Sequence, residues 1–409
     1  MGTDTSSVRL KRAITLPWLV FYGVGVTIGA GIFALVGVVL ELAGDKAPLA
    51  FLFAGAIAGV TGVSYALMIR IYPRAGGEAV FVNRGLGAFW ARIAGFGVVA
   101  TGIVSSAVIS PAFAGYIQDL LQLPNALLVI MVVTILSAIA CYGVRESVLF
   151  AALVTLLEVG TLLVVIAFGL PLLGDVDAVL LTLSPTTDLA ILTGVLSSSV
   201  LAFFAFIGFE DIVNMCEETK DAERTVPKAI YWTLGITLLV YVVLAIIAVL
   251  AGEREAIVSS SAPMARLFET VSGLSGKPVA VAATIAMING VLVQIVMASR
   301  VLYGMANEGI APIWFAQVHP QRQTPVRATV FVAVVIISLA LVFPLVRLAE
   351  VTSLVTLLVF SLVNLALFAL GRSAGEGRLH QFRYWGLGGA GLCLAIALFQ
   401  ISTGLLGGH

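Results

Sequence analysis

The sequence predicts an all-helical integral membrane protein. Hydrophobic residues make up 60% of the 409 positions and charged residues only 11%, and the mean hydropathy is +1.11. A soluble domain carries about 25% charged residues. The apolar residues also form long segments, and a helix needs about 20 of them to cross a bilayer. We therefore expect the chain to fold within a lipid bilayer.

The apolar segments define the expected spans. Eleven stretches are long enough to cross as helices. They cover residues 14–43, 47–72, 89–118, 125–143, 147–173, 191–218, 228–251, 278–304, 328–346, 350–371 and 383–406. The opening "MGTDTSSVRLKRAITLPW" has no separate short apolar run with a cleavage site. The first segment is therefore expected to stay as a span.

Basic residues set the expected orientation, because Lys and Arg near span ends are retained in the cytoplasm. With the N-terminus inside, 17 of the 22 Lys and Arg residues fall on the cytoplasmic side. The other five fall outside: Lys46, Arg254, Arg266, Lys277 and Arg347. We predict a multi-pass protein of the cytoplasmic (cell) membrane with residues 1–13 as a cytoplasmic tail.

The sequence lacks the usual motifs of metal sites, cofactor sites and enzymes. Its three cysteines form no C-x-x-C pair, and it has only three histidines, so we expect neither a disulfide nor a metal site. No Ser/His/Asp set or phosphate-binding loop is evident. The formal net charge of zero gives no indication of a nucleic acid partner. We predict no cofactor and no enzymatic activity.

The first segment carries its own helix breaker. In "GVTIGAGIFALVG", Gly29 and Gly31 flank Ala30, and each glycine costs a helix about 1 kcal/mol relative to alanine. Irregular backbone is tolerated in a bilayer only where it is buried in protein or lines a cavity. The pattern indicates a break in the span. The alternative is a packing face, because Gly25 and Gly29 also form G-x-x-x-G.

The sixth segment is interrupted as well. In "VLAFFAFIGFEDIVNMCEE", Gly208 is followed by Glu210 and Asp211, and a carboxylate in a lipid-facing helix costs at least about 2.5 kcal/mol. The alternative is that these acidic groups cap a broken helix or pair with cytoplasmic basic residues. Segments one and six lie five spans apart, so the second five-span unit would be inverted. Paired breaks of this kind indicate a transporter with a site near the midplane.

Two facing breaks offer complementary charges to a small ligand. The free amides that start a half-helix carry about +0.5 of a charge and attract a carboxylate. The carbonyl groups that end the preceding half-helix attract a cation. The arrangement therefore suits a zwitterion, which is what a free α-amino acid presents.

Four stretches resemble the signature segments of a known family. They are "GVTIGAGIF", "YPRAGGEAVFVNRGLG", "FFAFIGFEDIVNMCEETKDAERTVPKAI" and "ASRVLYGMANEGIAPIWFAQVHPQRQTPVRA", in this order. The chain resembles the amino acid-polyamine-organocation superfamily of permeases. The resemblance implies a leucine-transporter-type five-plus-five inverted repeat, residues 14–173 and 191–371, with helices 1 and 6 discontinuous. Residues 383–406 form an additional span, which gives eleven where the family usually has twelve.

The resemblance also implies a substrate site. The amides of Ala30 and Gly31 would bind the carboxylate. The carbonyl groups of Thr27, Phe204 and Ile207 would bind the ammonium, and the Phe204 ring would close over the substrate unless it is only a core aromatic. The substrate-binding residues are predicted to be Thr27, Gly29, Ala30, Gly31, Phe204, Ala205, Ile207 and Gly208. Their small or apolar side chains favour a small or apolar neutral amino acid.

Two other stretches bear on the expected site. The third segment, "TGIVSSAVIS", could add the hydroxyl groups of Ser105 and Ser106. The loop after the second segment has Ala79 and Phe81 where the family usually has tyrosines. We assign no function to that loop.

The fifth segment suggests the coupling ion. Glu158 stands alone in an apolar stretch, and an intramembrane carboxyl group is a functional candidate. In some family members a lysine occupies this position, and a glutamate could carry the proton itself. The alternative is a structural carboxyl group held by its neighbours, and Glu210 is a second candidate for coupling. The eighth segment, "AMINGVLVQ", lacks the adjacent hydroxyl residues of sodium-coupled relatives, which disfavours sodium.

These observations together predict a secondary active amino acid transporter. We expect proton-coupled symport, with the amino acid and the proton as its partners and the lipid bilayer as its surroundings. An exchanger or a facilitator without proton coupling is the alternative. A non-transporting amino acid sensor would keep the substrate site without the coupling cycle.

Overall fold

The computed structural model describes residues 12–73, 76–143, 148–373 and 379–406. Most of the predicted cytoplasmic tail, residues 1–13, lies outside these ranges. Fifteen α-helices form the described part, joined by short 3-10 helices. The described part also contains one isolated β-bridge, between Ile14 and Thr219. The prediction of an all-helical chain is confirmed.

The α-helices are α1 (Leu16–Ala43), α2 (Ala47–Ile69), α3 (Gly77–Leu86), α4 (Ala88–Leu121), α5 (Asn125–Tyr142), α6 (Val148–Gly169), α7 (Val176–Leu183), α8 (Leu189–Phe204), α9 (Ala222–Leu250), α10 (Arg254–Val258), α11 (Pro263–Ser272), α12 (Lys277–Asn307), α13 (Val326–Val342), α14 (Leu345–Ser373) and α15 (Arg383–Leu406). The 3-10 helices are η1 (Gly44–Lys46), η2 (Leu170–Gly174), η3 (Phe209–Glu218), η4 (Ile313–Ala316) and η5 (His380–Phe382). Each of the eleven predicted segments overlaps an α-helix of this series, and the sixth, residues 191–218, covers both most of α8 and the whole of η3.

Nine stretches of the described residues are long and apolar enough to cross a membrane. The first of them, Leu16–Ile69, has 54 residues and contains both α1 and α2. A further apolar helix, Val326–Val342, is shorter. The chain is a multi-pass membrane protein, and the division into eleven spans stays a prediction.

Acidic caps fix the starts of two helices. The Asp188 carboxylate accepts hydrogen bonds from Ala190 N at 2.8 Å and Ile191 N at 3.3 Å, at the start of α8. Asp175 caps α7 in the same way, through Ala178 N at 3.0 Å. Such a cap contributes about 1 kcal/mol to helix stability. The start of α8, the helix that leads to the second predicted break, is therefore well defined.

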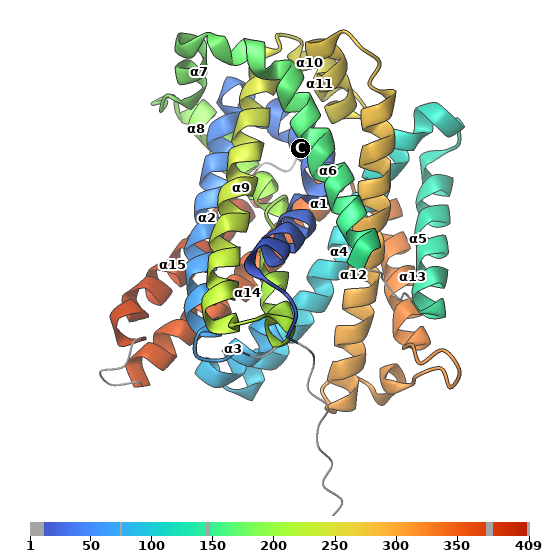
Figure 1. Ribbon diagram of the computed structural model, residues 1–409, viewed down its shortest axis with the longest axis vertical. Coiled ribbons are helices and arrows are strands. Elements are labelled where there is room, and N and C mark those ends of the chain that lie inside the picture. The colour runs from blue at the N-terminus through green and yellow to red at the C-terminus, as the bar shows by residue number, and fades with distance from the viewer. Residues whose placement is uncertain (1–11, 74–75, 144–147, 374–378, 407–409) are drawn as a thin grey trace, which may run out of the picture.

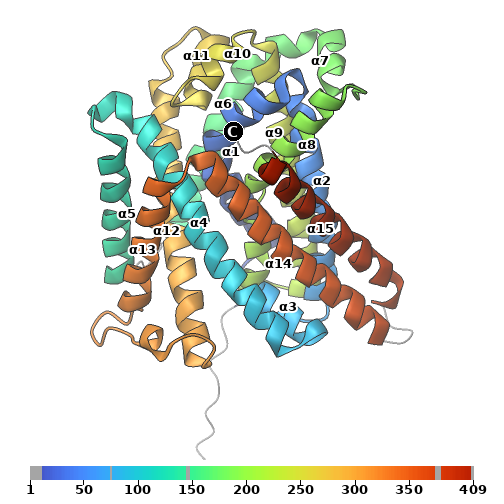
Figure 2. The same cartoon turned by 180° about the vertical axis from the view of Figure 1, so that it is seen from behind.

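Helix α1 lies at the centre of the bundle. It packs against α6, α8, α9 and η3, and Ile28, Ile32 and Phe33 are completely buried. Figure 1 shows α6 and α9 beside α1, and Figure 2 shows α4 and α14 crossing on the opposite face. Protein therefore surrounds the segment that the sequence predicts to be irregular, as a bilayer requires.

Short helices mark the two ends of the bundle. Figure 1 shows α7, α10 and α11 at one end and α3 at the other. Lys46 donates hydrogen bonds to Leu181 O and Ser184 Oγ, and Arg254 pairs with Asp45 at 3.2 Å. Two of the basic residues predicted to lie outside therefore share the end that holds α7.

Polar contacts attach the last helix. Asn364 of α14 donates a hydrogen bond to Thr61 Oγ1 of α2 at 3.1 Å. Thr61 Oγ1 also lies 3.7 Å from Cys393 Sγ of α15, and Trp385 Nε1 donates to Val60 O at 3.0 Å. The predicted eleventh segment is thus packed into the bundle.

Candidate functional site

The backbone of α1 departs from helical geometry at Gly29. This residue has φ 18° and ψ −149°, and a kink separates the two halves of the helix there. A Cβ atom added at Gly29 would meet nothing within 4 Å. The kink therefore leaves free space beside the backbone at the position where the sequence predicts a break.

The sixth segment departs from α-helical geometry over four residues. α8 ends at Phe204, residues 205–208 form turns, and the 3-10 helix η3 follows from Phe209. Gly208 has φ 125°, and a Cβ atom there would lie 2.8 Å from Val26 O. Both the conformation and the close approach require glycine. Gly208 is the residue beside which the sequence predicts an interruption of the sixth span.

The two irregular segments contact each other directly. A Cβ atom added at Gly31 would lie 2.8 Å from Ala205 Cα and 3.4 Å from Phe204 Cδ1. Gly208 approaches Val26 O from the other segment. Residues more than 170 positions apart in the sequence therefore lie in contact, and the small residues at the contact permit it.

Gly290 of α12 lies between Ala30 of α1 and Ile109 of α4. A Cβ atom added at Gly290 would lie 3.5 Å from Ala30 Cβ and 3.4 Å from Ile109 Cδ1. Ser106 donates its hydroxyl hydrogen to Gly102 O of its own helix at 2.9 Å. The Ser105 hydroxyl is buried without a hydrogen-bond partner. Of the two predicted serines, Ser105 is the one with a free polar group.

The remaining predicted residues lie around these contacts. Thr27 is buried, and its hydroxyl donates to Gly23 O at 2.8 Å. Phe204 is 5% exposed. Its carbonyl oxygen already accepts a hydrogen bond from Ile207 N at 3.2 Å. Thr27 and Phe204 both border the irregular segments. The Phe204 carbonyl oxygen has a second lone pair, which is left for a ligand.

Tyr241 of α9 joins the two irregular segments, and the sequence reasoning missed it. Its hydroxyl oxygen lies 3.2 Å from Thr27 O, 3.2 Å from Ile28 O and 2.9 Å from Ala205 O. The side chain is completely buried. The position of Tyr241 in the middle of an apolar stretch of the seventh segment is the signal that could have found it, because a buried hydroxyl group needs a polar partner.

Glu158 lies on α6, which packs against α1, α9 and α12. The residue is 1% exposed, and its Oε1 atom has no hydrogen-bond partner. It forms no ion pair with any described residue. A buried polar atom without a partner is uncommon in folded proteins. Glu158 is therefore a buried carboxyl group without an ion-pair partner among the described residues.

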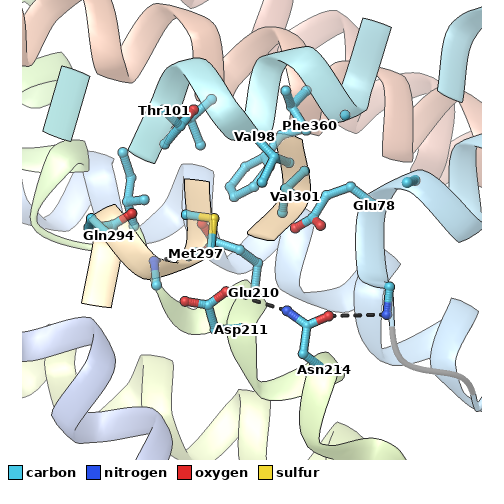
Figure 3. A pocket seen from close by; sticks show the side chains of 17 residues that line it. Glu78, Val98, Thr101, Glu210, Asp211, Asn214, Gln294, Met297, Val301 and Phe360 are labelled. Carbon is cyan, nitrogen blue, oxygen red and sulfur yellow. Dashed lines mark hydrogen bonds between the residues drawn. The ribbon is translucent and has the colours of Figure 1, made fainter. Parts of the chain in front are cut away.

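A cavity of about 130 Å³ extends from the second irregular segment toward α3. Ile207 and Gly208 line one part of it, and three acidic residues, Glu78, Glu210 and Asp211, line another. Figure 3 shows these three side chains around the same space. The described lining includes no Lys or Arg. A cationic group would therefore be favoured in this cavity.

Local hydrogen bonds hold the acidic side chains. Glu210 accepts from Gly208 N at 2.8 Å, which is the capping role that the sequence left as an alternative. Glu78 accepts from the Tyr65 hydroxyl at 3.0 Å. Burial raises the pKa of Glu78, and the hydrogen bonds that it accepts oppose this rise. Glu78 comes from the loop region to which the sequence assigned no function.

The described residues contain no group of three or more His, Cys, Asp and Glu side chains suited to a metal ion. The candidate site is instead built from backbone groups, one phenol and several carboxyl groups. Groups of these kinds form hydrogen bonds with charged or zwitterionic molecules in proteins.

The fold and the site define a helical membrane protein whose buried centre is formed by irregular backbone. A sequence profile of the amino acid permease family matches residues 14–405. The chain belongs to this family of transporters, within the amino acid-polyamine-organocation superfamily. The resemblance inferred from the four sequence stretches is confirmed.

Individual relatives are also transporters. An uncharacterized transporter of Mycobacterium tuberculosis is 32% identical over 376 residues, which is 90% of this chain and 83% of the relative. The vacuolar cationic amino acid transporter 4 of Arabidopsis thaliana is 28% identical over 386 residues, 88% of this chain and 64% of the relative. The methylthioribose transporter of Bacillus subtilis is 24% identical over 399 residues, 92% of this chain and 85% of the relative.

Proposed function

We propose that the protein is a secondary active transporter that carries amino acids across the cytoplasmic membrane. The observation that carries this proposal is the contact between the two irregular segments, Gly31 against Ala205 and Gly208 against Val26. The backbone of one segment thus lies directly against the backbone of the other, and a Cβ position at Gly29 has nothing within 4 Å. This arrangement offers a carboxylate and an ammonium group separate partners.

The proposed architecture is a five-plus-five inverted repeat. One repeat covers residues 14–173 and the other residues 191–371, with the first and sixth spans discontinuous and residues 383–406 as an eleventh span. The geometry at Gly29 and the turns over residues 205–208 support this division. The distribution of Lys and Arg supports a cytoplasmic N-terminus.

In the proposed site, the amides of Ala30 and Gly31 bind the substrate carboxylate, and Thr27 and Ile207 offer carbonyl groups to the ammonium. Phe204 borders Gly31 and covers the bound substrate. The side chains of Ala30 and Ala205 leave little polarity around the substrate side chain. This lining favours a small or apolar neutral amino acid.

We propose that transport is coupled to protons through Glu158. The carboxyl group is buried and unpaired, and a low-dielectric environment favours its neutral, protonated form. Symport follows if substrate and proton bind to the same conformation of the protein. Glu210, whose carboxylate caps η3, is the second candidate for this role.

Uptake by purified protein in sealed proteoliposomes tests the proposed function. With an inward proton gradient, labelled L-alanine should accumulate above the external concentration, and an ionophore that collapses the gradient should abolish accumulation. Uptake that occurs only when the proteoliposomes contain amino acid would identify an exchanger. Equilibration of the labelled substrate without accumulation would identify a facilitator. Binding without any flux would identify a sensor and contradict the proposal.

Phe204→Ala tests the predicted role of the aromatic ring. We expect the Kd for substrate to rise about tenfold, equivalent to about 1.4 kcal/mol, because one wall of the site is removed. Phe203→Ala is the matched control, since Phe203 is also buried but packs against Phe360. Both variants should lose thermal stability. Equal substrate affinity in the two variants would place Phe204 in the packing core.

The acidic cavity favours a second candidate substrate, a cationic amino acid. Three carboxyl groups lie along the space between the second irregular segment and α3. A lysine or arginine side chain passing through it would gain electrostatic stabilisation that a neutral side chain would not. The Arabidopsis relative is named as a cationic amino acid transporter.

Glu78→Gln tests whether the substrate is a cationic or a neutral amino acid. If cationic amino acids are substrates, the KM for L-arginine should rise about fivefold or more while the KM for L-alanine stays unchanged, because one attractive charge is lost. The control is Glu223→Gln, which removes the same charge from an exposed position at the start of α9. Unchanged L-arginine transport in Glu78→Gln would exclude a role for this carboxyl group in substrate selection.

A further inference from the structure

Three backbone hydrogen bonds join the chain just before α1 to the end of η3. Ala13 N and Ile14 N both donate to Glu218 O, at 2.9 and 3.0 Å, and Lys220 N donates to Ile14 O at 2.9 Å. A carbonyl oxygen has two lone pairs, so Glu218 O can accept both bonds. Ile14 and Thr219 form the β-bridge at this place. We call this set of backbone pairs the clasp. It links the two irregular segments at the ends that lie away from their kinks.

The clasp is anchored to both η3 and α9. Thr219 is completely buried, and its hydroxyl donates to Met215 O of η3 at 2.7 Å. Lys220 O accepts a hydrogen bond from Thr225 Oγ1 of α9 at 2.8 Å. Each such bond contributes about 1 kcal/mol. The chain before α1 is therefore attached to the corner between η3 and α9.

Close packing continues from the clasp to the kinks. The helix α1 packs against both η3 and α9. A Cβ atom added at Gly23 would lie 2.5 Å from Ile212 Cδ1 of η3 and 2.5 Å from Thr233 Oγ1 of α9. Gly208 approaches Val26 O nearer the kink. Elements packed this closely do not slide apart without repacking their side chains. The first half of α1, before Gly29, is thus held to η3 and α9 along its length.

The acidic cavity lies on another face of η3. Glu210, Asp211 and Asn214 of η3 line it, and α4, α12 and α14 supply much of the remaining lining, including Val98 and Val301. Figure 3 shows these side chains around the same space. No described residue of α1 lines the cavity. Open space therefore separates η3 from α4, α12 and α14, whereas side chains fill the contact between η3 and α1.

We propose that the first half of α1, η3 and α9 move as one unit, and that the cytoplasmic side of the substrate site opens along the acidic cavity, between this unit and α4, α12 and α14. The inference rests on the proposed transport function and orientation. Movement of α1 away from η3 would break the clasp and expose Ile212. The cavity already offers about 130 Å³ beside Ile207 and Gly208, and it extends toward α3.

Reactivity of single cysteines during transport tests the proposal. Ile212→Cys places a thiol between η3 and α1, and Val98→Cys and Val301→Cys each place one in the cavity. The background carries Cys141→Ser, Cys216→Ala and Cys393→Ala. A membrane-impermeant methanethiosulfonate reagent is present on both sides of the proteoliposome membrane, together with L-alanine or L-arginine. Because a thiol that stays buried is unreactive, the cavity variants should react more than about tenfold faster than Ile212→Cys, equivalent to about 1.4 kcal/mol.

The two pathways give opposite results in this experiment. If α1 swings away from η3 in each transport cycle, Ile212→Cys becomes exposed and reacts as fast as the cavity variants. That result overturns the proposal. Cavity variants that both stay unreactive while the protein transports substrate overturn it as well.

A disulfide across the clasp tests the shared movement independently. Neighbouring strands lie about 4.8 Å apart, within the range of about 4.4–6.8 Å that a disulfide spans between Cα atoms. In the same background, oxidised Ile14→Cys/Thr219→Cys protein should take up substrate within about twofold of the reduced protein, equivalent to about 0.4 kcal/mol. The two single variants are the matched controls, and their uptake should not respond to oxidant or reductant.

The outcomes separate this inference from the proposed function. Uptake that falls about tenfold or more on oxidation of the double variant, and returns with reductant, shows that the clasp must open and overturns the inference alone. A wild-type protein that binds amino acids without any flux contradicts the proposed transport function instead.

Discussion

Gly31→Leu is expected to abolish transport while the protein still inserts into the membrane. A Cβ atom at this position would lie 2.8 Å from the backbone Cα of Ala205, which cannot move aside as a flexible side chain would. Overpacking of this kind costs about 1–3 kcal/mol for small additions, and a leucine adds further atoms in the proposed place of the carboxylate. We expect uptake to fall more than tenfold, since about 1.4 kcal/mol corresponds to that factor.

The measurement combines uptake in proteoliposomes with size-exclusion chromatography of the detergent-extracted protein. Gly235→Leu is the matched control, because Gly235 is an exposed helical residue of α9 with nothing within 4 Å of its Cβ position. Gly31→Ala should give a smaller loss than Gly31→Leu. Normal uptake by an inserted Gly31→Leu protein would show that the substrate binds elsewhere.

The sequence predictions for the site rest on residues that conflict with a plain transmembrane helix. Glycines at 29 and 31, and acidic residues after Gly208, are unfavourable in such a helix. Because this free-energy cost follows from the residue types alone, it can be recognised without a structure. Their contact through Gly31 and Ala205 required the structure, because the two residues are distant in the sequence and no local signal fixes how the segments pack.

The residues that the sequence reasoning missed have ordinary local surroundings. Tyr241 lies in an apolar span and matches the composition of a buried helix, so its three carbonyl contacts depend on where α9 packs. Glu78 lies outside the nine candidate spans, where an acidic residue carries no penalty. It reaches the cavity only because α3 folds back against α4 and α14.

Glu158→Gln is expected to separate substrate transport from proton coupling. Glutamine matches the protonated carboxyl group in size and can still donate a hydrogen bond, but it cannot release a proton. Substrate binding and exchange of internal for external amino acid should therefore survive, with a Kd within about twofold of the wild type, equivalent to about 0.4 kcal/mol. Accumulation driven by a pH gradient should be lost, and uptake should no longer depend on pH.

A proton gradient can drive transport only through a group that is protonated in one conformation of the transport cycle and deprotonated in another. Glu158 is suited to this role because it is 1% exposed and its Oε1 atom has no hydrogen-bond partner. Glu158→Asp is the matched variant, since it keeps an ionisable group with one methylene fewer. It should retain part of the gradient-driven accumulation that Glu158→Gln loses. If Glu158→Gln concentrates substrate as well as the wild type, Glu158 is structural, and the coupling role passes to Glu210 or Asp211, or to no residue in a simple exchanger.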